Sequence, residues 1–119
     1  MTYVDGFVVP VRKKQLATYR RMAKQAGKIW RGYGALTFNE CVADDVPFGK
    51  RTSFPRSVKL KRGETVVFSW IGYRSRAHRD RVMAKVMKDK RIEAMMKIKP
   101  VPFDAKRMIV GGFRTMVSL

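Results

Sequence analysis

The amino-acid sequence predicts an α+β fold with the element order βαββαβ. Segments with a two-residue hydrophobic period alternate with segments in which apolar residues recur every three or four positions, and glycine or proline separates them. The length of 119 residues is close to the commonest size of one domain. We therefore expect residues 1–119 to form a single domain.

The first strand and the first helix account for the first part of the chain. Apolar side chains alternate in residues 2–11, and no basic region precedes them as it would in a signal peptide, so we interpret this segment as a strand. From residue 12 to about 33 the period becomes helical, and Gly34 provides a stop because glycine tolerates the left-handed conformation that ends many helices. The apolar stripe of this helix consists of Leu16, Tyr19, Ala23, Ala26, Gly27 and Trp30.

The remaining elements repeat this order. We expect strands at residues 35–44, 65–73 and 107–119, a long irregular segment at 45–64, a helix at 75–88 and a short helix from 89 onward. Ser75 and Asp89 are the expected N-caps, since their side chains can accept hydrogen bonds from free backbone amides. Four strands and two main helices predict a ferredoxin-like sandwich, in which helices cover one face of a four-stranded antiparallel sheet.

Two of the predicted strands are apolar on both sides. On the third strand Val66, Phe68 and Trp70 point one way. Val67, Ile71 and Tyr73 point the other way, and the last strand shows the same two-sided pattern. A chain of this length has no third layer to cover the second face, so the pattern predicts a homodimer that packs sheet to sheet. The alternative is a monomer in which residues 45–64 cover this face.

The charge of the chain is unusual. There are 27 Lys and Arg residues against 9 Asp and Glu, a formal net charge of +18, and the basic residues are dispersed along the chain. This charge predicts non-specific binding of polyanions in vitro. The exposed helix positions expected to bind a polyanion are Arg20, Lys24, Lys28, Arg31, Arg81, Lys85 and Lys88. No recognised DNA- or RNA-binding module accompanies them, so a dedicated nucleic-acid role is the weaker interpretation.

Four residues are candidates for catalysis. His78 is the only histidine and titrates near neutral pH, although a surface or capping role is the simpler interpretation. Asp44 and its neighbour Asp45 could bind a cation, or could polarise a substrate with Arg74 or Arg107 opposite. A strand-end turn with salt bridges is the simpler interpretation of this acidic pair. Tyr73 and Arg107 have polar ends that could face a ligand in a cleft between helix and sheet.

The single cysteine limits the chemistry further. Cys41 excludes an intramolecular disulfide and fits a reducing compartment, so we expect a cytoplasmic protein and a buried, inert thiol. One histidine and one cysteine cannot supply the usual zinc ligand set, and no glycine-rich phosphate loop is present. We expect neither a metal nor a cofactor, and no membrane span. The pair Gly111–Gly112 lies inside a predicted strand and indicates a bulge or the close approach of another backbone.

Several segments make the family recognisable. The chain closely resembles the bacterial family called domain of unknown function 1428 in the segments YVDGFVVPV, ECVADDVPFGKRTSFP, VVFSWIGYRSRAHRDRV and PFDAKRMIVGGF. The resemblance implies a dimeric α/β-barrel. The wider superfamily with this architecture includes monooxygenases, lactone isomerases and stress-response proteins, so the fold does not specify a reaction.

The basic helices depart from this family, whose members are closer to neutral. The departure indicates either a polyanionic partner or a surface that was recharged by adaptation or engineering. The function we expect is that of a homodimer with a small-molecule cleft and an unspecified reaction, so whether it is an enzyme stays open. The alternatives are a basic module that binds RNA or DNA, and a recharged scaffold without activity.

Overall fold

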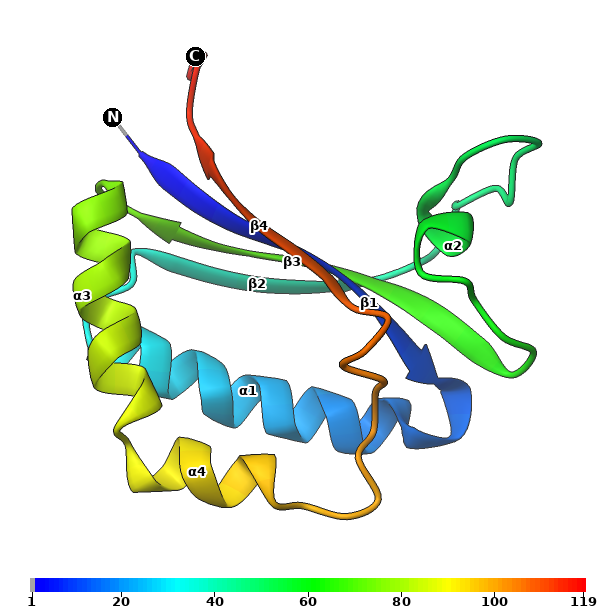
Figure 1. Ribbon diagram of the computed structural model, residues 1–119, viewed down its shortest axis with the longest axis horizontal. Helices are drawn as coiled ribbons and strands as arrows, with labels where there is room; N and C mark the ends of the chain where they lie inside the picture. Colours follow the sequence, from blue (N-terminus) through cyan, green and yellow to red (C-terminus); the bar gives the residue numbers. More distant parts are fainter. Residues whose placement is uncertain (1) are drawn as a thin grey trace.

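The computed structural model describes residues 2–119 and contains a four-stranded antiparallel sheet (Figure 1). Its strands are β1 (Tyr3–Arg12), β2 (Thr37–Val42), β3 (Glu64–Tyr73) and β4 (Ile109–Arg114), in the spatial order β2-β3-β1-β4. The helical connections join strands that have another strand between them, which is the ferredoxin-like βαββαβ arrangement. The fold class predicted from the sequence is confirmed.

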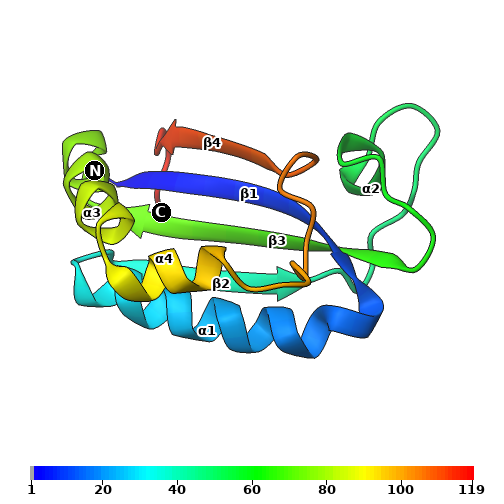
Figure 2. The same cartoon turned by 60° about the horizontal axis from the view of Figure 1, so that its bottom comes forward.

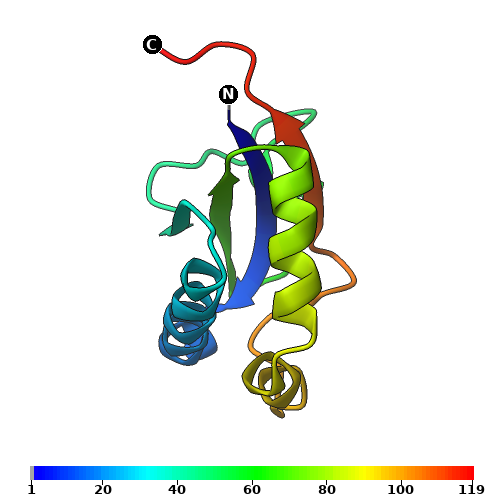
Figure 3. The same cartoon turned by 90° about the vertical axis from the view of Figure 1, so that its left-hand side faces the viewer.

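The helices lie where the hydrophobic periods place them. A short 3-10 turn (Lys13–Gln15) leads into α1 (Leu16–Gly32), and α3 (Arg76–Met87) and α4 (Lys90–Met96) follow β3. Ser75 and Asp89 cap α3 and α4 as expected, accepting hydrogen bonds from the amides of His78 and Arg91. Figures 1 and 2 show α1 and α4 side by side beneath the sheet, and Figure 3 shows α3 crossing one end of the strands. No helix of residues 2–119 is long and apolar enough to cross a bilayer.

The core lies between the helices and one face of the sheet. Tyr3, Ile71 and Tyr73 of the central strands pack against buried side chains of all three helices. The helical partners are Ile29 of α1, Val82 and Val86 of α3, and Ile92 and Met95 of α4. These strand residues share one face because side chains in a strand alternate between the two faces.

The opposite face of the sheet is apolar and uncovered, and we call it the open face. Phe68 and Trp70 lie there side by side, with their ring centroids 5.7 Å apart. Phe68, Ile109 and Phe113 keep 42%, 43% and 63% of their surface exposed. The two-sided strand pattern predicted from the sequence is therefore confirmed: Phe68, Ile109 and Phe113 stay partly exposed in the described chain, whereas Val66 at one end of the same face is 4% exposed.

Gly112 has a different role from the one expected. The register of β1 with β4 runs without interruption from Tyr3–Arg114 to Val8–Ile109, so there is no bulge. A side chain at Gly112 would instead collide with the hydroxyl group of Tyr3 on the neighbouring strand. The close approach that requires glycine therefore comes from a side chain, and the expectation of a bulge or an approaching backbone is wrong.

The segment between β2 and β3 is an organised arm that projects beyond the sheet (Figure 1). It contains the single-turn helix α2 (Phe54–Ser57), and Arg56 donates hydrogen bonds to the carbonyl oxygens of Phe48 and Gly49. Phe54 makes an edge-to-face contact with Phe68 at 5.7 Å between ring centroids. The arm therefore covers one end of the open face, where Val66 is 4% exposed, and leaves Phe68 42% exposed.

Candidate functional site

A groove between α1 and the edge strand β2 has a volume of about 930 Å³. Volumes of this size are typical of small-molecule sites. The groove exists because β2 has a neighbouring strand on one side only, while α1 lies along its other side. Gly27 lets α1 approach the strand, since a β-carbon at this position would lie 2.7 Å from the Phe38 ring.

The floor of the groove is apolar. It is lined by side chains of α1, β2 and β3, namely Leu16, Ala23, Leu36, Phe38, Val42 and Val67. Trp30 packs beside this floor, with its ring centroid 6.1 Å from that of Phe38. Phe68 and Trp70 lie on the open face and take no part in this floor. The floor offers contact area for an apolar or aromatic ligand.

One carboxyl group interrupts this apolar floor. Glu40 lies on β2 between Phe38 and Val42, and the Tyr19 hydroxyl of α1 donates a hydrogen bond of 2.7 Å to its Oε1 atom. Glu40 is exposed at the groove, but partial burial of its carboxyl group raises the pKa of that group, and hydrogen bonds from Tyr19 and Ser69 only partly offset this effect. Burial also raises the pKa of the Tyr19 hydroxyl, which therefore stays protonated. Glu40 and Tyr19 are the polar pair with which a bound ligand would exchange hydrogen bonds.

Four cationic side chains form one rim of the groove. They are Arg20, Lys24, Lys28 and Arg31, spaced by three or four residues along a single edge of α1. Among residues 2–119, no carboxylate forms an ion pair with any of them. We call this row the basic rim. Its unpaired charges create a positive potential beside an apolar floor, where anions are attracted.

Glu40 was not among the residues predicted from the sequence, although a signal was present. An acidic residue that occupies an apolar face of a strand is unusual, and Glu40 interrupts the alternation of Phe38 and Val42. The basic rim consists of the four predicted polyanion-binding residues of the first helix. The three others, Arg81 and Lys85 on α3 and Lys88 at its C-terminal cap, are exposed and do not line the groove.

Two of the four candidate catalytic residues are neighbours. The rings of Tyr73 and His78 meet edge to face at 5.9 Å, and the Tyr73 hydroxyl accepts a hydrogen bond of 3.1 Å from Trp30. Tyr73 is fully buried and His78 is 4% exposed. Burial, together with the charges of Arg74 and Arg81, lowers the pKa of His78, so its ring is neutral at pH 7.

His78 is occupied by backbone contacts. Its Nδ1 atom accepts a hydrogen bond of 3.0 Å from the Arg74 amide, and its own amide donates to the Ser75 hydroxyl at 3.0 Å. These contacts hold the start of α3 against β3. The burial of His78 and these hydrogen bonds fit a structural, capping role. Its catalytic role stays a prediction.

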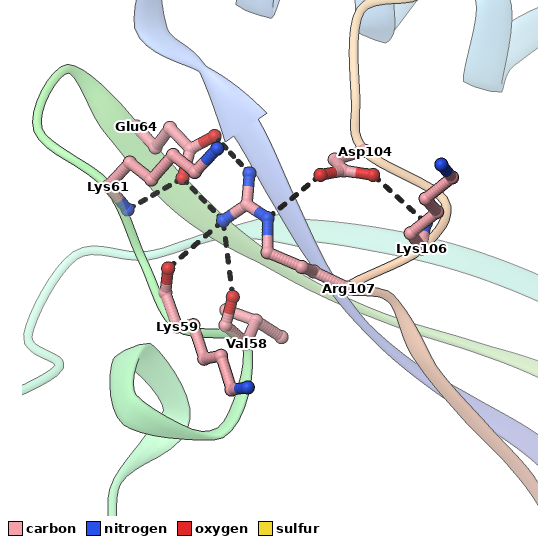
Figure 4. A network of polar contacts seen from close by, with 7 residues as sticks. All are labelled: Val58, Lys59, Lys61, Glu64, Asp104, Lys106 and Arg107. Atoms are coloured by element: carbon pink, nitrogen blue, oxygen red, sulfur yellow. Dashed lines mark hydrogen bonds and ion pairs between the residues drawn. The ribbon is translucent and has the colours of Figure 1, made fainter.

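The other two candidates lie near the opposite end of β3. Asp44 is exposed just beyond β2, where the amide of Ala43 bonds to the carbonyl of Val66 at 2.9 Å. Arg107 binds Glu64 through both Nη atoms, at 2.8 and 2.6 Å, and binds Asp104 at 2.9 Å (Figure 4). Since Glu64 and Tyr73 are the two ends of β3, the structure does not bring the four candidates together in one cavity. Their catalytic role remains a prediction.

Cys41 is exposed, and the expectation of a buried thiol is wrong for the isolated chain. It pairs with Phe68 on the open face, because its position on β2 alternates with that of Glu40. Within residues 2–119, no three His, Cys, Asp or Glu side chains gather as they would around a metal ion.

Comparisons with known proteins place the chain among relatives of similar length. The uncharacterized protein YbaA of Escherichia coli K12 is 46% identical over 118 residues, which cover 99% of both chains. An uncharacterized protein of the same name from Shigella flexneri matches equally well. Among solved structures, the de novo designed protein Foldit4 aligns with a TM-score of 0.49 at 14% identity, over 97% of this chain and 99% of that one.

A family model decides the assignment. The model described as "Protein of unknown function (DUF1428)" matches residues 2–105, which is most of the chain. The matched range includes α1, β2 and the groove between them. Together with the YbaA relatives, this match shows that the chain belongs to the DUF1428 family.

Proposed function

We propose that the groove between α1 and β2 binds a small anionic molecule with an apolar or aromatic body, in a protein that acts as a homodimer. The observation that carries the proposal is the basic rim beside the apolar floor. Arg20, Lys24, Lys28 and Arg31 face one cavity without acidic partners in the described chain. A ligand with a carboxylate, sulfonate or phosphate at one end matches both surfaces at once.

Glu40 and Tyr19 would orient the ligand. Both polar groups sit on an otherwise apolar floor, so a ligand that has a hydrogen-bonding group in its apolar part gains a fixed position there. An ionised Glu40 would repel an anion, whereas a protonated Glu40 can donate a hydrogen bond to it. The raised pKa of Glu40 therefore favours the ligand-binding form at mildly acidic pH.

The homodimer is proposed from the open face. Phe68, Ile109 and Phe113 expose large apolar surfaces beside Trp70, and a second copy that packs sheet to sheet would bury them. The same contact would cover Cys41. C2 symmetry is the commonest arrangement for such self-complementary faces. The basic rim and the apolar floor of the groove lie on the helical side of the sheet, away from this contact, and only Asn39 and Cys41 line the groove from the open-face side of β2.

A second candidate function is the binding of an extended polyanion across the helices. It is favoured by Arg81 and Lys85 on α3 and Lys88 at its C-terminal cap, which are exposed and unpaired among the described residues. Helix α3 contacts α1, so the basic residues of the two helices belong to neighbouring elements. A polyanion that uses both helices would lose affinity steeply with salt and would depend on α3 as much as on α1.

A fluorescent anion separates these candidates. We would titrate the protein with 1-anilinonaphthalene-8-sulfonate and with the uncharged N-phenyl-1-naphthylamine. Substitution Lys24→Gln/Lys28→Gln removes half of the basic rim, and Lys85→Gln/Lys88→Gln removes the same charge from α3. We expect the rim variant to weaken sulfonate binding about threefold, since two ion contacts of a few tenths of a kcal/mol each are lost. The α3 variant should bind as the wild type does.

The uncharged probe is the control for the apolar floor. It should bind both variants and the wild type with equal affinity, because neither substitution alters the floor. Equal loss of sulfonate binding in the two variants would indicate an effect of overall charge and would favour the polyanion interpretation. If neither substitution changes the affinity for the sulfonate probe, the probe binds at the open face and the proposal is contradicted. No binding of either probe would support a scaffold without a ligand.

A further inference from the structure

A second hollow, with a volume of about 600 Å³, lies where β1 ends, β3 begins and residues 99–107 cross between them. It is separate from the groove, since the two cavities share no lining residue. We call it the clasp hollow, after the contacts of Arg107 that close one side of it.

The walls of the clasp hollow are held in place by backbone contacts and by Arg107. Phe103 forms a β-bridge with Val11, and the amide of Asp104 donates to the carbonyl of Pro10 at 3.4 Å. Arg107 joins three segments, because it binds Glu64, Asp104 and the carbonyl oxygens of Val58 and Lys59 (Figure 4). The side chains of Arg107 and Glu64 are 14% and 8% exposed, so this contact is largely shielded from water. The hollow is therefore bounded by a fixed framework.

The charge in the clasp hollow is unbalanced. Both of its acidic residues are bound by Arg107. Their other hydrogen bonds come from backbone amides, that of Lys61 to Glu64 and that of Lys106 to Asp104, and the nearby charge of Lys61 contributes to the lowered pKa of both carboxyl groups. The other cationic side chains that line the hollow are Arg12, Lys61, Arg62, Lys99 and Lys106. None of these five forms an ion pair within residues 2–119. Like charges gathered around one cavity repel each other, and a multivalent anion would relieve that repulsion.

We propose that the clasp hollow binds a short phosphate chain, either inorganic polyphosphate or the phosphates of a nucleoside triphosphate. Five cations around one cavity exceed what a single phosphate can contact, whereas a chain of three phosphates can reach several of them. Lysine and arginine are the usual ligands of phosphate oxygens. A strand of nucleic acid fits less well, because its phosphates follow an extended track, whereas these five exposed cations all line one hollow.

The test compares two double variants with equal loss of charge. Lys61→Gln/Lys106→Gln removes two cations from different walls of the hollow and leaves the backbone amides that bind Glu64 and Asp104. Lys85→Gln/Lys88→Gln removes two cations from α3. Binding of phosphate, pyrophosphate, tripolyphosphate and ATP would be measured by isothermal titration calorimetry at physiological ionic strength. Sulfonate-probe binding at the groove, unchanged in the hollow variant, verifies that this variant is folded.

We expect the affinity of the wild type to rise from phosphate to tripolyphosphate. The affinity of the hollow variant for tripolyphosphate should be about tenfold lower than that of the wild type, and the affinity of the α3 variant should stay within about twofold of it. Equal affinity for ATP and tripolyphosphate would identify the phosphate chain as the recognised part, and tighter binding of ATP would add a nucleoside contact. Equal losses in both variants would overturn the proposal, as would equal affinity for phosphate and tripolyphosphate. A competition experiment with single-stranded oligothymidine tests the nucleic-acid alternative. If the oligonucleotide displaces tripolyphosphate from the wild type but not from the hollow variant, the hollow binds a nucleic-acid strand and the proposal is wrong.

Discussion

Glu40 illustrates how neighbouring residues determine the chemistry of a side chain. Although Glu40 is an exposed residue, its carboxyl group lies against an apolar floor and beside Tyr19 and Ser69. Loss of water raises its pKa, so the folded protein binds this proton more tightly than the unfolded chain does. This difference links the pH both to stability and to the binding of an anion.

Glu40→Gln should change the pH dependence of stability in a defined direction. A raised pKa in the folded state means that Glu40 contributes full stability below its unfolded pKa of about 4.5, and that this contribution is lost as the pH rises through the folded pKa. Relative to the wild type, the variant should therefore gain stability as the pH increases from 4.5 to 7. The measurement is urea unfolding at several pH values.

The same substitution should change ligand binding. In the wild type, affinity for the sulfonate probe should increase as the pH falls, since protonation of Glu40 removes a negative charge from the floor while the basic rim stays charged. Glu40→Gln should bind the probe independently of pH over this range. Glu93→Gln is the control, because Glu93 is 63% exposed and pairs only with Lys97. Identical pH profiles of wild type and Glu40→Gln would show that Glu40 does not titrate there.

Helix α1 serves both the core and the groove. Its buried residues Tyr19, Gly27 and Ile29 pack toward the sheet, and the basic rim follows its outer edge. The distance between α1 and β2 is set by Gly27, which lies against Phe38 without an intervening side chain. The width of the groove therefore depends on one glycine in the middle of a helix, where glycine is otherwise unfavourable.

Gly27→Ala should destabilise the protein and alter the groove. The added methyl group would lie 2.7–3.1 Å from three ring atoms of Phe38, so the helix or the ring must move. Overpacking of this kind outweighs the better helix propensity of alanine, and we expect a net loss of about 1 kcal/mol. The measurement is chemical denaturation together with probe binding, which should weaken.

Gly32→Ala is the matched control for this prediction. It lies in the last turn of the same helix, and a β-carbon there would meet no atom within 4 Å. Its stability should equal or slightly exceed that of the wild type, and its probe binding should not change. If Gly27→Ala has the same stability and probe affinity as Gly32→Ala, the Phe38 ring moves without loss of stability, and Gly27 does not set the width of the groove.

At the scale of the whole molecule, a charge of +18 and an exposed apolar face act against each other. Burial of the open face favours association, whereas two copies with this charge repel each other. Salt screens the repulsion and leaves apolar burial intact, so the proposed dimer should be more stable at higher ionic strength. The binding of phosphate chains at the clasp hollow should show the opposite salt dependence.

Phe68→Lys tests the dimer. Phe68 lies at the centre of the open face, on the inner strand β3, and a charge there would be buried without a partner if two sheets pack together. We expect the wild type to sediment as a dimer and the variant as a monomer in analytical ultracentrifugation. Met96→Lys adds the same charge on α4, where Met96 is 68% exposed, and should leave the dimer intact. A monomeric wild type at both low and high salt would contradict the proposal.

Much of the fold could be predicted because it depends on local pattern. Alternation placed β1 and β3 to within a residue or two, and Ser75 and Asp89 identified the starts of α3 and α4 through their capping side chains. The last strand was predicted to reach residue 119 but ends at Arg114, because an apolar pattern alone does not indicate where a strand loses its hydrogen-bonded neighbour. The two-sided strands also follow from alternation, and they predicted the open face.

The sites depended on contacts between segments that are far apart in the sequence. The sequence alone shows the basic rim as one side of a helix. Only the folded chain shows that this rim lies beside β2 and that Tyr19 pairs with Glu40. The same is true of the ion pairs that Arg107 forms with Glu64 and Asp104. The sequence by itself determined the elements, the two apolar faces and the charge, since these follow from periodicity and composition. Only the tertiary structure decided which charges share a cavity and which acids are already occupied, because those properties depend on distances across the sheet and between the loops.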